Sequence, residues 1–343
     1  MNSIPKRRVG KSGLEITELG FGGAVIGNLY EAVSNAKALD TVASAYENEV
    51  RYFDTAPFYG FGLSERRIGL ALGDWPRDSY VLSTKVGRIL QPTDPAKVVG
   101  GLFEQVPAAS PRYDYSYDAV MRSVDDSLQR LGLHRIDILL IHDIDTVNHG
   151  AMAETERRYR EVMDGGYRAM ERMRAEGTVG AIGLGVNEWQ WCERFAKTTD
   201  LDCYLLSGRY TLLDQESLDS FLPLCESKGI SVIIGGPYNS GILAVGAVAG
   251  AHYDYGPASP ATMDRVRRLS AVCVRFGVQL PAAALQFPLH HPCVASVIPG
   301  ARSRTEVERN AELYRAVIPT EFWHELKAEG LLRKDAPIQS TRK

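Results

Sequence analysis

Eight strand-length apolar runs recur along this chain, and segments with helical periodicity separate them. The runs lie at residues 16–22, 51–56, 80–86, 136–143, 179–186, 203–208, 230–236 and 295–300. Most of them are continuously apolar, as expected for strands that are buried on both faces. Strands that alternate with helices pair in parallel, because a parallel neighbour is reached through a helical crossover. An open doubly wound sheet satisfies the same pattern, but eight units within 343 residues favour a closed (β/α)8 TIM barrel.

The segments between the runs indicate where helices begin and end. In residues 119–132, the apolar stripe at helical spacing consists of Val120, Val124, Leu128 and Leu131. Gly132 follows this stripe as the expected C-cap. In residues 64–73, Ser64 is the expected N-cap and Gly73 the expected end of the helix.

Two connections are longer than the others. Residues 87–117 follow the third strand run, and residues 237–262 follow the seventh. Loops of this length are uncommon and often functional, and barrels place their active sites at the C-terminal ends of the strands. We therefore predict long loops at the C-terminal face, although two surface insertions without a role would fit the same residues. No linker interrupts the series, so we expect residues 1–343 to form a single domain.

Composition excludes several classes of function. The 39 basic and 42 acidic residues leave a net charge of −3, and this balance gives no indication of binding to nucleic acid or to an anionic membrane. No segment approaches the roughly 20 apolar residues of a membrane span, and the N-terminus lacks the apolar stretch of a signal peptide. The 5 cysteines are scattered, without a Cys-x-x-Cys, so we interpret them as buried structural thiols in a cytoplasmic protein. We also expect no metal, because the sequence has no HExxH and His290–His291 are adjacent.

Polar residues occur at the ends of three neighbouring strand runs. Asp54 ends the second run and Tyr59 lies in the loop that follows; Lys85 lies within the third run. His142 ends the fourth run. A lysine in an apolar strand is costly to bury without a partner, and Asp54 could supply one. A structural ion pair alone would explain Asp54 and Lys85, but it would not require Tyr59 and His142.

Together these four residues are suited to acid–base catalysis. A phenol has a pKa near ~10, and we expect the nearby ammonium of Lys85 to lower the pKa of Tyr59 toward neutrality. A neutral His142 can donate a hydrogen bond to a carbonyl or alkoxide oxygen. Such a centre fits proton transfer at an alcohol or carbonyl. The accompanying hydride needs a cofactor, because no side chain carries one.

The motifs around these residues resemble those of the aldo-keto reductases, from near residue 6 to near residue 330. RRVGKSGLEITELGFGG (7–23) is similar to the family's N-terminal hairpin and first strand. DTAPFYGFGLSE (54–65), STKV (83–86) and LLIHD (139–143) resemble the motifs that carry the family's catalytic residues. The resemblance implies that Asp54, Tyr59, Lys85 and His142 form a catalytic tetrad.

The same resemblance implies a nicotinamide dinucleotide bound across the barrel mouth. GLGVNEW (183–189) is similar to the segment that holds the nicotinamide carboxamide, and IPGARSRTEVERN (298–310) to the phosphate- and adenosine-binding segment. The implied cofactor residues are Asn187, Ser207, Gly236, Tyr238, Gly300, Arg302, Glu306 and Asn310. The family's aromatic residue that stacks on nicotinamide is replaced around Gly235–Gly236, so Tyr210 or Tyr238 is expected to substitute.

We expect NAD to be preferred, with NADP possible. NADP-dependent relatives place a basic residue near the position of Glu306, and a carboxylate there would repel a 2′-phosphate. Arg302 and Arg304 leave the alternative open, since either could reach the phosphate from another direction.

Residues 115–145 and 322–332 resemble the bacterial aldose 1-dehydrogenase branch of the family. The implied reaction is oxidation of a cyclic hemiacetal, such as L-fucose or D-arabinose, to a lactone. The alternatives are a pyridoxal 4-dehydrogenase, a general NADPH-dependent aldehyde reductase, and a cofactor-bound regulatory subunit. Candidate substrate residues are Phe58, Tyr113, Asp143 and Trp189, with Tyr238 also near the mouth. The partner is a small molecule, and the sequence leaves the oligomeric state open.

Overall fold

The computed structural model describes residues 3–338 and contains a strand of the main sheet in each of the eight predicted runs. The strands of the main sheet are β3 (Phe21–Gly22), β4 (Tyr52–Asp54), β5 (Val81–Val86), β8 (Ile138–His142), β9 (Ala181–Val186), β10 (Cys203–Ser207), β11 (Ser231–Gly235) and β14 (Val294–Ile298). Neighbouring strands pair in parallel, in the order β14-β11-β10-β9-β8-β5-β4-β3. Bridges between Leu19 and Val297 and between Gly22 and Gly300 join the two ends of the sheet. The predicted (β/α)8 barrel is therefore confirmed.

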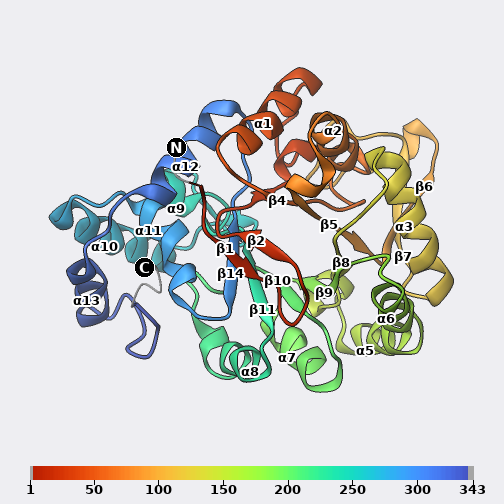
Figure 1. Ribbon diagram of the computed structural model, residues 1–343. Coiled ribbons are helices and arrows are strands. Elements are labelled where there is room, and N and C mark those ends of the chain that lie inside the picture. Colours follow the sequence, from red (N-terminus) through yellow and green to blue (C-terminus); the bar gives the residue numbers. More distant parts are fainter. Residues whose placement is uncertain (1–2, 339–343) are drawn as a thin grey trace.

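Helices surround the sheet on its outer side (Figure 1). The longer ones are α1 (Asn35–Glu47), α2 (Leu63–Leu72), α3 (Tyr117–Leu131), α5 (Met152–Glu161), α6 (Tyr167–Ala175), α7 (Trp189–Thr198), α8 (Phe221–Lys228), α10 (Pro260–Phe276), α11 (Leu280–Gln286), α12 (Arg304–Arg315) and α13 (Thr320–Ala328). α3 begins after the N-cap Ser116 and ends at Gly132, whose φ of 65° satisfies the expected C-cap. The apolar faces of these helices form the main core against the sheet.

Alternation along the strands divides the barrel interior from the outer core. On β8, Ile138 and Leu140 belong to the inner cluster, whereas Leu139 and Ile141 pack toward the helices. Side chains on a strand alternate between the two faces, so His142 points inward at the end of β8. The same alternation puts Asp54 on the inner face together with Tyr52 of β4. It puts Lys85 on the inner face together with Val81 of β5. The barrel interior thus changes from apolar to polar toward the C-terminal ends of the strands.

The first predicted run contains two separate elements. β1 (Lys6–Arg8) and β2 (Glu15–Thr17) form an antiparallel hairpin, and the barrel strand β3 starts only at Phe21. Val9 and Ile16 of the hairpin join the inner cluster, so the hairpin covers the N-terminal end of the barrel. The hairpin expected from the resemblance is present, but the prediction of one continuous strand was wrong.

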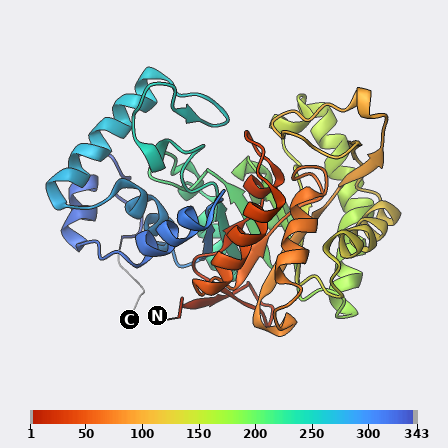
Figure 2. The same cartoon turned by 90° about the horizontal axis from the view of Figure 1, so that it is seen from above.

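Both long connections lie on the side of the barrel opposite the N-terminus (Figure 2). The first contains the antiparallel hairpin of β6 (Arg88–Pro92) and β7 (Ala109–Tyr113), with a short helical turn, η3 (Pro95–Lys97), between them. The second contains α9 (Ile242–Val245) and the short strands β12 (His252–Tyr253) and β13 (Gly256–Pro257). A further short helix, α4 (Thr146–His149), follows β8.

The start of α2 corrects one prediction. The helix begins at Leu63 with Gly62 in the N-cap position, and Ser64 lies inside it. The hydroxyl of Ser64 donates to the carbonyl of Gly23 at 2.7 Å and is hydrogen-bonded to the Thr55 hydroxyl at 2.8 Å. Ser64 therefore joins the ends of β3 and β4 instead of capping the helix.

The cysteines and the most apolar helices agree with the composition of the chain. All five cysteines are free and buried, as predicted. Between residues 3 and 338, no single helix has the length and apolarity of a membrane span; only the bent pair Pro260–Phe276 and Leu280–His290 passes by length and composition.

Candidate active site

A buried ion pair lies at the polar end of the barrel interior. The ammonium of Lys85 donates to Asp54 Oδ2 at 2.7 Å and to the carbonyl of Thr55 at 2.9 Å. Ser83, two residues before Lys85 on β5, donates to the other Asp54 oxygen at 2.7 Å. Gly185 on β9 leaves room for the lysine, since a Cβ there would lie 3.3 Å from Lys85 Cε. The predicted partnership of Asp54 and Lys85 is therefore present.

Tyr59 and His142 lie directly above this pair. The Lys85 ammonium is 4.5 Å from the centre of the Tyr59 ring. The Tyr59 and His142 rings meet edge to face, with their centres 5.7 Å apart. The structure thus brings together all four residues of the predicted tetrad, from β4, β5, β8 and the loop after β4.

The ionisation of these groups differs in one respect from the expectation. Burial, and then the charges of Lys85 and Arg88, hold the pKa of His142 well below its ordinary value, so this imidazole is neutral as expected. Burial also raises the pKa of Tyr59 well above its ordinary value, and the negative charges of Asp54 and Asp143 raise it further. The expected lowering of the Tyr59 pKa was wrong, because burial of the hydroxyl disfavours the charged phenolate. The raised pKa makes the protonated phenol the main form of Tyr59 at neutral pH.

Tyr115 supports the turn that carries His142. Its buried hydroxyl donates to the carbonyl of His142 at 2.7 Å and approaches that of Asp143 at 3.2 Å. Gly87 makes room for this ring: its φ is +97°, and a Cβ would lie 2.1 Å from Tyr115 Cε1. Tyr115 lies within the long connection of residues 87–117, and the sequence assigned it no role, because only the folded chain brings it to His142.

Arg88 is a site residue that the sequence did not indicate. It pairs with Asp143, and its guanidinium lies over the ring of Phe58, 3.2 Å from the ring centre, and 4.8 Å from that of Tyr113. Phe58 in turn packs edge-on against His142, at 6.3 Å between ring centres. Three of the four predicted substrate residues therefore gather around Arg88. The sequence did contain one indication of this role, since Arg88 is a charged residue just after β5, at the start of the long loop.

Asn187 and Ser207 lie together at the ends of β9 and β10. The hydroxyl of Tyr255 is 3.2 Å from Ser207 Oγ and donates to Asn187 Oδ1 at 3.4 Å. Gly236 adjoins them, since a Cβ on this residue would lie 3.6 Å from Ser207 Oγ. Tyr255 reaches this position from the second long loop, which Arg209 anchors by donating to Asp254 at 2.7 Å and to the Asn187 carbonyl at 3.0 Å. Tyr255 lies within the long connection of residues 237–262, and the sequence assigned it no role.

The two tyrosines proposed as substitutes for the stacking aromatic occupy different environments. Tyr210 is fully buried, with its ring against Phe287 and His291, so the prediction that it could face a cofactor was wrong. Tyr238 is half-buried, and its hydroxyl donates to Asn310 Oδ1 at 2.7 Å. The structure therefore connects two predicted cofactor residues, one from the loop after β11 and one from α12.

In the segment from Gly300 to the start of α12, one nitrogen atom, Arg302 Nε, is suited to donate to an anionic ligand. Arg302 Nε is buried and has no hydrogen-bond partner within residues 3–338, with the Glu31 carboxylate 3.6 Å away. Glu306 accepts from the Arg302 amide at 2.8 Å, and its own amide donates to the N-cap Ser303 at 3.3 Å. These bonds hold a carboxylate at the helix N-terminus.

Two further residues of this segment have structural contacts. Arg304 is paired with Asp40 and Glu47 of α1, at 2.6 and 2.5 Å. Gly300 pairs with Gly22 where the barrel closes, and a Cβ there would lie 2.4 Å from Val25 Cγ2.

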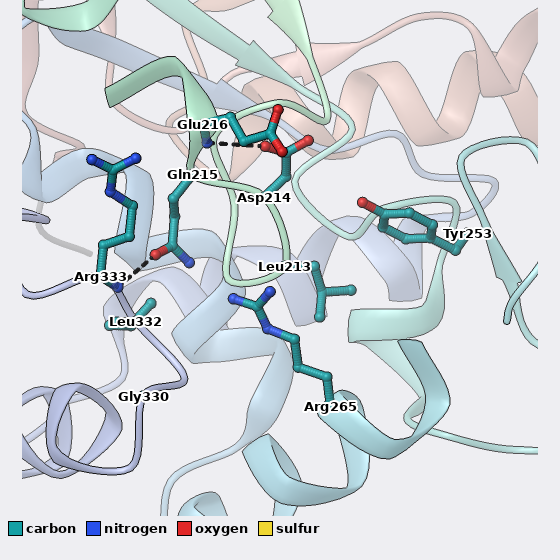
Figure 3. A pocket seen from close by; sticks show the side chains of 9 residues that line it. All are labelled: Leu213, Asp214, Gln215, Glu216, Tyr253, Arg265, Gly330, Leu332 and Arg333. Atoms are coloured by element: carbon teal, nitrogen blue, oxygen red, sulfur yellow. Dashed lines mark hydrogen bonds between the residues drawn. The ribbon is translucent and has the colours of Figure 1, made fainter. Parts of the chain in front are cut away.

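Neither Trp189 nor the cavity drawn in Figure 3 takes part in the contacts described above. Trp189 is the first residue of α7 and packs against the main core. The cavity, of about 330 Å³, is lined by Leu213, Asp214, Gln215, Glu216, Tyr253, Arg265, Gly330, Leu332 and Arg333. None of the predicted site residues lines it, so this cavity is separate from the predicted site. Residues 3–338 contain no group of three or more side chains arranged to hold a metal ion.

The chain matches the Aldo/keto reductase family over residues 18–329 and belongs to this family. Pyridoxal 4-dehydrogenase from Microbacterium luteolum is 41% identical over 341 residues, covering 97% of this chain and 99% of that protein. D-threo-aldose 1-dehydrogenase from a Pseudomonas species is 37% identical over 328 residues, covering 94% and 96%. A solved aldo-keto reductase from Bacillus halodurans, in its holo form, shares the fold with a TM-score of 0.70 over 99% of both chains, at 24% identity.

These findings confirm the resemblance to aldose and pyridoxal dehydrogenases. The protein is an NAD(P)-dependent oxidoreductase that uses a nicotinamide cofactor and acts on a small molecule.

Proposed function

We propose that the protein oxidises the anomeric hydroxyl of a cyclic hemiacetal to a lactone, with an aldose such as L-fucose or D-arabinose as substrate. The observation that carries this proposal is the edge-to-face pair of Tyr59 and neutral His142 above the Lys85–Asp54 ion pair. One proton carrier and one neutral donor beside each other suit an oxygen that alternates between alcohol and carbonyl. Of the two relatives named above, the 37% identical one carries the name of an enzyme for an aldose.

In this proposal each residue of the tetrad has a separate task. Tyr59 accepts the proton of the anomeric hydroxyl, and His142 donates a hydrogen bond to the same oxygen as the carbonyl forms. Lys85 and Asp54 hold each other at the base of the site and set the charge beneath the Tyr59 ring. When bound, the oxidised nicotinamide would supply the hydride acceptor that no side chain provides.

We assign the cofactor to the residues that the sequence indicated, in two groups. Asn187, Ser207 and Gly236 would hold the nicotinamide end, beneath the Tyr255 hydroxyl. Gly300, Arg302, Glu306 and Asn310 would hold the phosphates and adenosine, with Tyr238 joined to Asn310. Arg302 Nε supports this assignment, because within residues 3–338 it is buried without a hydrogen bond, and its ion pair with Glu31, at 3.6 Å, is longer than a hydrogen bond. We place the reaction in the cytoplasm, since the five cysteines are free thiols.

NAD⁺ is expected to be preferred over NADP⁺ by at least about tenfold in kcat/KM, as ~1.4 kcal/mol corresponds to that ratio. The Glu306 carboxylate is fixed at the start of α12 and would repel a 2′-phosphate. The ion pairs of Arg304 with Asp40 and Glu47 direct that arginine toward α1. Steady-state kinetics with both cofactors at a fixed sugar concentration measure the ratio, and a tenfold preference for NADP⁺ would contradict the assignment.

The rate of oxidation is expected to rise with pH. Because the pKa of Tyr59 is raised, its phenolate is a minor form near neutral pH and increases as the pH rises. At limiting hemiacetal, kcat/KM for oxidation should increase from about pH 6 to about pH 9, whereas reduction, which uses the protonated phenol, should change little. A pH-independent oxidation rate over this range would show that Tyr59 is not the base.

A substrate panel with NAD⁺ tests the proposed function. L-fucose, D-arabinose and pyridoxal are each incubated with the enzyme, and the products are identified by mass spectrometry and NMR. Lactones from the sugars are the expected result. Formation of 4-pyridoxolactone alone would favour the pyridoxal dehydrogenase alternative, which the 41% identical relative supports. Reduction of open-chain aldehydes with NADPH, without any lactone, would identify a general aldehyde reductase instead.

A further inference from the structure

The ion pair of Arg88 and Asp143 is enclosed beside the catalytic residues. The two side chains are 11% and 9% exposed. Phe58 and Tyr113 flank the guanidinium on their ring faces. Within residues 3–338, Asp143 is the carboxylate paired with Arg88. A planar guanidinium has five N–H donors, so one carboxylate leaves donors available for a ligand.

The backbone holds Asp143 in an uncommon conformation. Its φ is +58°, in the left-handed region that non-glycine residues rarely occupy. Its amide donates to the Gly185 carbonyl at 2.9 Å, and Tyr115 supports its own carbonyl from below. The side chain is therefore fixed immediately after His142, at the mouth of the barrel.

The distance to His142 indicates which part of a substrate this pair can reach. Asp143 Oδ2 lies 3.5 Å from His142 Nε2. The reacting oxygen of the substrate would be within hydrogen-bond distance of His142, and the oxygen of a neighbouring carbon is about 3 Å further on, itself a hydrogen-bond length. That second oxygen would therefore lie beside the Asp143 carboxylate and the Arg88 guanidinium.

We propose that Asp143 and Arg88 recognise a neutral hydroxyl group on the carbon next to the reacting carbon. Asp143 accepts the hydrogen of this hydroxyl, and Arg88 donates to its oxygen, so the pair offers one acceptor and one donor to a group that needs both. The two charges balance, which favours a hydroxyl over an anionic phenolate at that position. The inference rests on the proposed function and restricts its substrates to 2-hydroxy aldoses.

The test compares a sugar with its 2-deoxy analogue. With the wild-type enzyme and NAD⁺, kcat/KM for L-fucose should exceed that for 2-deoxy-L-fucose by at least about tenfold, because a hydrogen bond to a charged group is lost. In Asp143→Asn and in Arg88→Met, the ratio should fall toward one. Each ratio is internal to one protein sample, so a variant with a reduced folded fraction still gives a valid ratio. Asp118→Asn, on the exposed first turn of α3, is the matched control and should keep the wild-type ratio.

The outcomes separate the inference from the function on which it rests. Equal kcat/KM for both sugars in the wild type, or an unchanged ratio in Asp143→Asn, would overturn the inference while leaving lactone formation intact. If neither sugar is oxidised, the proposed function fails, and the comparison is made in the reductive direction with lactaldehyde and propionaldehyde. In that comparison, the inference is supported if the wild type prefers lactaldehyde, the 2-hydroxy aldehyde, and Asp143→Asn loses the preference. Equal rates for the two aldehydes in the wild type would overturn it.

Discussion

Replacing Tyr59 by phenylalanine is expected to lower kcat by at least about 10²-fold, the smaller end of the effect of a general acid–base group. The substitution keeps the ring that lies above Lys85 and beside His142, and it removes only the hydroxyl. The binding of NADH should therefore change little. Fluorescence titration with NADH measures that binding, and steady-state kinetics measure kcat.

Tyr117→Phe is the matched control for this experiment. The Tyr117 hydroxyl accepts a hydrogen bond from Arg172 at 2.9 Å on the outer side of the barrel, far in the fold from the tetrad. Its loss should leave kcat within a factor of about two, as for an exposed contact of small energy. Near-normal turnover in Tyr59→Phe would show that another group carries the proton.

Replacing Lys85 by methionine is expected to destabilise the protein by about 3–5 kcal/mol and to abolish activity. The substitution removes the ammonium that lies 2.7 Å from Asp54 and leaves a buried carboxylate without a counter-charge, with the Ser83 hydroxyl still donating to it. The double variant Asp54→Leu/Lys85→Met removes both charges and should recover much of the stability without recovering activity. Denaturant unfolding followed by circular dichroism measures the stability of each variant.

Lys97→Met serves as the control for this series, because Lys97 is exposed in the long loop after β5. It should unfold at the wild-type denaturant concentration. If Lys85→Met were as stable as the wild type, Asp54 would be neutral or otherwise satisfied, and the ion pair would not determine the charge beneath Tyr59.

The fold and the tetrad could be predicted because both depend on local patterns. Continuous apolar runs identify strands buried on both faces, and the crossovers between them require a parallel sheet. Asp54, Lys85 and His142 interrupt such runs near their C-terminal ends. A polar residue at that place in a parallel barrel faces the mouth. The period of two along each strand then brings the three side chains inward.

Other features depend on contacts between distant parts of the chain, which the sequence pattern does not contain. Arg88 and Tyr115 start and follow the β6–β7 hairpin, and only its folded course brings them to Asp143 and His142. Tyr255 reaches Asn187 from 68 residues away in the chain. The pKa of Tyr59 was predicted wrongly for a related reason. The direction of the pKa shift depends on burial and on the distances to carboxylates, which the sequence does not give.

The most direct test follows the C1 hydrogen of the sugar. The enzyme is incubated with NAD⁺ and C1-deuterated L-fucose or D-arabinose, whichever gives the greater kcat/KM. NMR should show the deuterium on C4 of the reduced nicotinamide, in equal amount to the lactone, because the proposed function has the hydride leave the carbon whose oxygen would lie between Tyr59 and His142. Reduced cofactor without deuterium, or deuterium retained in the sugar product, would contradict oxidation of the hemiacetal carbon at this site.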